Sequence, residues 1–97
     1  MKKKAYILTY SREPGNDYSL FHKQLVELPE IITWSHYIKS SYILITEIST
    51  ATKLNKLILP LMPNNRFLLI EVKLDNRNGR LPVAGWNWFK NHEDDTK

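Results

Sequence analysis

The order in which strand-like and helix-like patterns follow one another constrains the fold of this chain more than any other feature. The patterns read strand, helix, strand, strand, helix, strand, and a tryptophan-rich tail completes the 97 residues. This order is typical of a split βαβ sheet. The sequence therefore predicts an α+β fold, namely a ferredoxin-like βαββαβ sandwich with a short C-terminal extension.

Prolines and capping residues give the expected bounds of the two main helices. The first helix should begin near Tyr18 and end before Pro29, because the residue before a proline avoids the α region. The second should begin after Ser49 or Thr50 and stop near Pro60. Strands rich in β-branched and aromatic residues are expected over residues 6–11, 31–39, 41–48 and 66–74.

The remaining segments complete a single domain over residues 1–97. Asn16 or Asp17 is the expected cap of the first helix. The tail is expected to form a helix from about Val83. We expect residues 1–4 and 93–97 to be flexible ends.

Composition places the chain among ordinary globular proteins, with 42% hydrophobic and 25% charged residues. There is no cysteine, which excludes disulfides, thiolate catalysis and cysteine-ligated zinc. The apolar stretch after the N-terminal lysines is too short for a signal peptide, and no segment is long enough to span a membrane. We expect a cytoplasmic protein with no membrane association.

The formal net charge of the chain is +4, and Lys2, Lys3 and Lys4 at the N-terminus contribute three positive charges to it. A dedicated nucleic-acid-binding domain usually shows a denser basic patch on its folded body. Two interpretations of this terminus stay open: a solvated end that aids solubility, or an arm that contacts phosphates.

Both faces of the predicted sheet carry apolar side chains, because strand residues alternate between faces. Two helices can cover only one face, so the other face predicts a homodimer. The alternative is that the tail folds back and covers this face within one chain. In the second strand, Ile32, Trp34, His36 and Ile38 are expected to share a face. The large aromatic residues expected to pack at the dimer interface or between the tail and the body are Trp34, Phe67, Trp86 and Trp88.

Few residues suggest catalysis, and we expect no metal and no cofactor. The histidines His22, His36 and His92 lack the spacing of metal ligands. Glu13 and Asp17 flank the first loop and could bind magnesium, although a cap and a solvated carboxylate are the simpler interpretation. The segment SSYILITE occupies the position of an RNA-reading strand but lacks the basic and aromatic signature of that family.

Several segments carry a family resemblance that covers about residues 5–91. They are YILTYSREPGNDYSLFHKQL, TWSHYIKSSYILIT, FLLIEV and WNWFKN. They resemble short bacterial proteins labelled SinR-like, which are similar to the ferredoxin-like CRISPR-associated proteins of the second Cas type and to VapD toxins. The resemblance implies a ferredoxin-like homodimer. In the nuclease relatives the first strand ends in an aspartate that holds a metal across the dimer axis, and the matching position here is Ser11.

Three functions follow as hypotheses. The first is a non-catalytic homodimeric module that binds nucleic acid or a protein, since a serine is a poor substitute for a magnesium-binding aspartate. The alternative is a metal-dependent endoribonuclease or toxin that uses Glu13 or Asp17. A ligand-sensing domain is the third. The candidate nucleic-acid-binding residues are Arg12, Lys39, Arg66 and Lys73.

Overall fold

The computed structural model describes residues 2–96 and confirms a mixed α+β domain. Lys4 already belongs to the first strand, and the last residues described form a short 3-10 helix. The expectation of flexible ends at residues 1 and 97 lies outside the described residues. No helix within residues 2–96 is long and apolar enough to cross a membrane.

In chain order the elements are β1 (Lys4–Tyr10), α1 (Ser19–Val26), β2 (Ile31–Ile38), β3 (Ser41–Thr46), α2 (Ala51–Ile58), the 3-10 helix η1 (Leu59–Leu61), β4 (Phe67–Val72), α3 (Val83–His92) and the 3-10 helix η2 (Glu93–Thr96).

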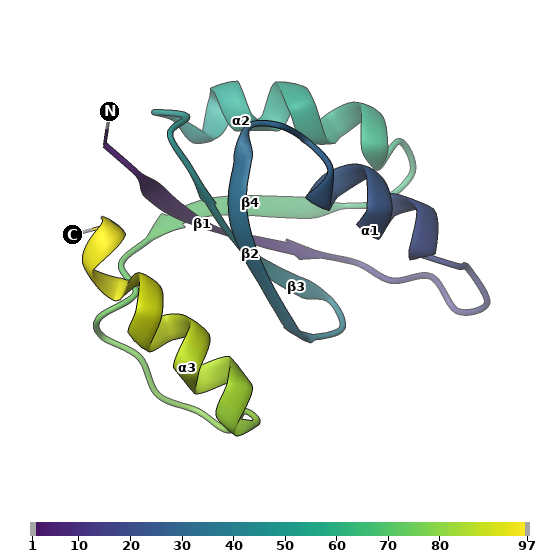
Figure 1. Cartoon of the computed structure of the whole chain (residues 1–97). Helices are drawn as coiled ribbons and strands as arrows, with labels where there is room; N and C mark the ends of the chain where they lie inside the picture. Colours follow the sequence, from purple (N-terminus) through teal and green to yellow (C-terminus); the bar gives the residue numbers. More distant parts are fainter. Residues whose placement is uncertain (1, 97) are drawn as a thin grey trace.

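The four strands form one antiparallel sheet in the order β2-β3-β1-β4. Leu8, near the centre of β1, lies opposite Tyr42 on β3 and Leu69 on β4. The connection through α1 passes over β3, and the connection through α2 passes over β1. Figure 1 shows α1 and α2 on one face of this sheet and α3 on the other.

Local sequence explains where the two crossover helices begin. Thr50 is the cap of α2, where its Oγ1 accepts a hydrogen bond from the backbone N–H of Lys53 at 3.2 Å. The cap position of α1 is Tyr18, not Asn16 or Asp17, and Tyr18 makes no side-chain cap bond. Asp17 lies one residue earlier and accepts from the Ser19 N–H at 2.8 Å. Its carboxylate therefore still satisfies a donor at the start of the helix.

The main core fills the space between the sheet and the two crossover helices. Phe21 and Leu25 on α1, and Leu54 and Ile58 on α2, are buried at a spacing of four residues. That spacing places each pair on one side of its helix. The strands complete this core with the buried side chains of Tyr6, Leu8, Tyr10, Ile31, Tyr42 and Leu44.

A second, smaller core lies on the opposite face, beneath α3. Phe89 packs there with Ala5, Ile45 and Leu74. The helix predicted from Val83 is confirmed, and it covers part of this face within one chain. The indole N–H of Trp88 donates to Thr33 Oγ1 at 3.2 Å, and Trp86 also packs at the edge of this cluster.

The prediction that Ile38 shares a face with Trp34 and His36 is wrong. Two irregularities in the pairing of β2 with β3, after Ile31 and after Ser35, interrupt the alternation. Between Ser35 and Ile38, β2 carries one more residue than the facing segment of β3, and such an extra residue defines a β-bulge. Trp34 therefore lies on the face of α1 and α2, whereas Ile38 pairs with Ser41 on the other face.

The part of the second face that α3 does not cover exposes aliphatic side chains. Leu68 and Ile70 on the edge strand β4 are 52% and 50% exposed, and Ile38 on the other edge strand is 58% exposed. Their partners Thr9 and Ile7 on β1 are half-buried. Ser41 and Thr9 lie between Ile38 and Leu68, so Ile38 stands apart. We call the surface formed by Ile7, Leu68 and Ile70 the open apolar face.

Candidate functional site

The structure brings three of the four predicted basic residues to one end of the sheet. This end holds the end of β1, the β2–β3 turn and the start of β4. We call it the basic end. Ser11 continues β1, and its N–H donates to the carbonyl oxygen of Arg66 at 2.9 Å. Arg12 Nη1 donates to the carbonyl oxygen of Lys39 at 3.0 Å. The side chains of Arg12, Lys39 and Arg66 are all exposed.

Arg12 is the best-anchored residue of the basic end. Its guanidinium carbon lies 4.3 Å from the centre of the Tyr18 ring, a cation–π arrangement. Its Nη1 also lies 3.4 Å from the hydroxyl of Tyr10, which itself donates to the Lys39 carbonyl at 2.7 Å. A guanidinium has five N–H donors, so these contacts use only part of its capacity and still orient it.

Ser11, at the strand-end position of the family resemblance, has a structural partner. Its hydroxyl accepts from the Arg66 N–H at 3.2 Å and lies 3.4 Å from the Arg66 carbonyl oxygen. The Asn65 side-chain amide donates to the Ser11 carbonyl at 2.6 Å and to the Tyr18 hydroxyl at 3.0 Å. The Ser11 hydroxyl thus extends the β1–β4 pairing by one residue.

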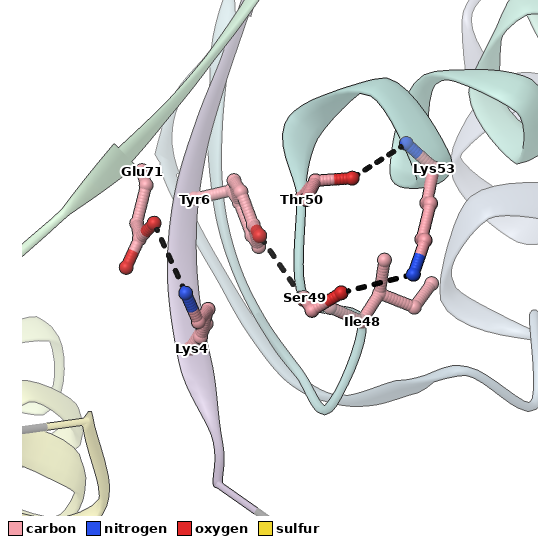
Figure 2. A network of polar contacts seen from close by, with 7 residues as sticks. All are labelled: Lys4, Tyr6, Ile48, Ser49, Thr50, Lys53 and Glu71. Atoms are coloured by element: carbon pink, nitrogen blue, oxygen red, sulfur yellow. Dashed lines mark hydrogen bonds and ion pairs between the residues drawn. The ribbon is translucent and has the colours of Figure 1, made fainter.

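Lys73 lies apart from the other three candidates. It follows β4 directly, and Val72 at the end of β4 pairs with Ala5 at the start of β1. Because β1 and β4 are antiparallel, this is the end of the sheet opposite Arg12. Figure 2 shows the contacts there: Lys4 and Glu71 form an ion pair at 3.5 Å, and the Tyr6 hydroxyl donates to the Ile48 carbonyl at 3.0 Å. These contacts join β1 to its neighbours.

A stack of aromatic rings and histidines lies beside the basic end, on the face of α1 and α2. The His36 ring lies parallel to the buried Tyr42 ring, with centroids 3.8 Å apart. His22 Nδ1 lies 2.6 Å from the Tyr42 hydroxyl, and the Trp34 ring meets the His22 ring edge-on at 4.9 Å. The Tyr10 ring stacks on Tyr42 from another side at 6.1 Å.

The hydrogen bonds of this stack indicate where Tyr42 and His36 carry their protons. Burial, reinforced by the neighbouring Tyr10, raises the pKa of Tyr42 far above its ordinary value, so its hydroxyl stays protonated and can donate to His22 Nδ1. His36 Nδ1 lies 2.9 Å from the Ser41 carbonyl oxygen, which can only accept. His36 therefore carries a proton on Nδ1. Sequence reasoning treated these histidines as isolated, although His36 and Tyr42 lie on adjacent strands.

The carboxylates proposed for catalysis do not converge. Asp17 Oδ1 accepts hydrogen bonds from the hydroxyl and from the N–H of Ser19, and these bonds, the hydroxyl bond first, lower the pKa of Asp17. Glu13 is exposed, and its backbone N–H donates to the Tyr18 hydroxyl at 2.7 Å. Among residues 2–96 no group of three or more histidine, aspartate and glutamate side chains is placed to hold a metal ion. In the tail, His92 Nδ1 lies 3.3 Å from Asp95 Oδ2.

The four large aromatic residues predicted to pack at a dimer interface or between the tail and the body separate onto the two faces. Trp34 is 37% exposed on the face of α1 and α2, and Phe67 packs at the edge of the main core. Trp86 and Trp88 belong to α3 and pack against the cluster on the other face. The four therefore do not form one surface.

Comparison of the chain with protein-family models, with curated proteins and with solved structures finds no match.

Proposed function

We propose that this chain is a non-catalytic homodimeric module of ferredoxin-like topology that binds single-stranded nucleic acid at its basic end. The strand order β2-β3-β1-β4, with the crossover helices α1 and α2 on one face, supports the topology. Ser11 favours a role without catalysis, since its hydroxyl is neutral and is engaged with the backbone of Arg66.

The anchored guanidinium of Arg12, next to Lys39 and Arg66, is the observation that carries the proposed binding. Three exposed cations meet where β1, the β2–β3 turn and β4 come together. Such a cluster neutralises phosphates and releases their counterions. Tyr18 adds an aromatic ring that packs against Arg12, and aromatic rings beside cations are typical of single-strand binding surfaces.

The open apolar face supports the homodimer. Leu68 and Ile70 stand on an edge strand and are about half exposed. Ile70 lies opposite Ile7 on β1. An exposed aliphatic surface often marks an interface, and a two-fold axis allows the same surface to cover itself. Leu68 lies only two residues from Arg66, so a dimer formed here sets two basic ends close together. A single strand could then contact both copies.

Removing the three cations of the basic end should abolish most of the binding. We expect the triple variant Arg12→Ala, Lys39→Ala, Arg66→Ala to bind a fluorescent single-stranded RNA about a hundredfold more weakly at about 0.1 M salt. The slope of log affinity against log salt concentration should fall by about 2, since each phosphate contact on a single strand contributes about 0.7. Fluorescence anisotropy over a salt series measures both quantities.

A matched control removes the same charge elsewhere. The variant Lys56→Ala, Lys73→Ala, Lys90→Ala loses three exposed cations away from the basic end and should keep its affinity within about threefold. Equal losses in both variants would show that only net charge matters and would refute the site. Cleavage of the RNA that requires magnesium and disappears in Asp17→Ala would instead support the nuclease alternative.

A further inference from the structure

A cleft opens on the second face of the sheet, between the strands and the segment that leads into α3. Its volume is about 310 Å³, which falls at the lower end of the range for small-molecule sites. Ile7, Ile38 and Ile43 line it from the strands. Residues 77–81 line it from the returning segment, together with Trp86 of α3. None of the three cations of the basic end lines this cleft.

The lining combines apolar and aromatic side chains with positive charge. Two arginines, Arg77 and Arg80, border the cleft, and none of its lining residues, all within residues 2–96, is acidic. Tyr37, Ser35 and Ser41 add hydroxyl groups. A site of this kind matches a ligand with a planar apolar body and an acidic group. The apolar body would pack on the apolar and aromatic lining, and the acidic group would pair with the positive charge.

The two arginines have different roles. Arg77 forms an ion pair with Glu93, donates to the Leu74 carbonyl oxygen at 3.0 Å and lies over the Phe89 ring at 5.4 Å. It is a positioning residue that holds the wall of the cleft, and Glu93 compensates its charge. The Arg80 guanidinium is exposed and makes no ion pair within the described part of the chain. Arg80 is therefore the cation available to an incoming anion.

We infer that this cleft binds a small aromatic organic anion, with its ring system against Ile43 and Trp86 and its acidic group on Arg80. The inference is independent of the nucleic-acid binding proposed above, since the cleft contains none of Arg12, Lys39 and Arg66. It does share Ile7 with the open apolar face, so the probe titrations are made on the wild-type chain and on the Leu68→Gln, Ile70→Thr variant, and both should bind the anionic probe. Charge complementarity decides the class of ligand, because Arg80 makes no ion pair within residues 2–96 and stands beside an apolar floor.

Two probes that differ only in charge test the site. 8-Anilinonaphthalene-1-sulfonate carries an aromatic body and an anion, and N-phenyl-1-naphthylamine is the same body without the sulfonate. We expect the anionic probe to bind at one site per chain with a Kd on the order of tens of micromolar, as measured by its fluorescence. Arg80→Gln should weaken the anionic probe about tenfold and change the neutral probe less than twofold.

Arg66→Gln is the matched control, because it removes an exposed arginine from the other site. It should leave the affinity for the anionic probe unchanged, while Arg80→Gln should leave the affinity for RNA unchanged. Urea unfolding of both variants checks that they are folded. The inference is refuted if the folded wild-type chain does not bind the anionic probe, if Arg80→Gln weakens both probes equally, or if Arg66→Gln acts as strongly as Arg80→Gln.

Discussion

Replacing Phe89 by alanine should lower the free energy of unfolding by about 3–5 kcal/mol, the range for removing a buried aromatic ring. Phe89 is 8% exposed and lies at the centre of the core beneath α3, against Ala5, Ile45 and Leu74. Its ring also supports the Arg77 guanidinium. Such a loss is a large share of the 5–15 kcal/mol that stabilises a typical domain. Urea unfolding followed by circular dichroism gives the value.

Hydrogen exchange and a surface control make this prediction specific. The amides of α3 (Val83–His92) should lose more protection than those of β1, because Phe89 fastens this helix to the sheet. Leu20→Ala removes an aliphatic side chain that is 65% exposed and should change stability by less than about 0.5 kcal/mol. A loss below about 1 kcal/mol for Phe89→Ala, with α3 still protected, would show that the helix does not depend on this contact.

Tyr42→Ala should have a comparable effect on the other face, about 3–5 kcal/mol by analogy with phenylalanine. Tyr42 is buried beneath His36 and also contacts Tyr10, Phe21 and His22. Its loss leaves a cavity where α1 meets β3, since surrounding side chains relax only partly. The same urea measurement tests it.

Tyr42→Phe separates the ring from its hydroxyl. It keeps the stacking on His36 and removes only the hydrogen bond to His22 Nδ1. Because His22 is half-buried and water can reach it, we expect a loss of about 0.5–1.5 kcal/mol. If Tyr42→Phe cost as much as Tyr42→Ala, the hydroxyl and not the stack would hold the cluster together.

The sequence predicts the elements well wherever local patterns determine them. Pro60 falls in η1, where α2 ends, and the tail helix begins at Val83 as expected. Tyr6, Leu8 and Tyr10 alternate along β1, and all three side chains face the main core. The alternation fails in β2, because a bulge depends on the pairing with β3 and leaves no signature in the residues themselves.

The candidate sites depend more strongly on long-range contacts. The sequence identifies Arg12, Lys39, Arg66 and Lys73 as basic residues, but it does not show which end of the sheet each occupies. The antiparallel pairing of β1 and β4 places Lys73 at the end opposite the other three. Sequence reasoning missed Arg77 and Arg80 as part of a cleft, because the cleft exists only once α3 returns to the second face. In the sequence, only the tryptophans of the tail indicate that α3 packs back onto the second face of the sheet.

We propose that the open apolar face pairs with a second copy of the chain, and the mass of the particle in solution tests this proposal. Light scattering at low micromolar concentration should give twice the 11.5 kDa of one chain. The variant Leu68→Gln, Ile70→Thr should give the mass of one chain, while Leu20→Gln, Leu59→Gln, on exposed helix surfaces, should remain double. A wild-type particle of 11.5 kDa would contradict the claim.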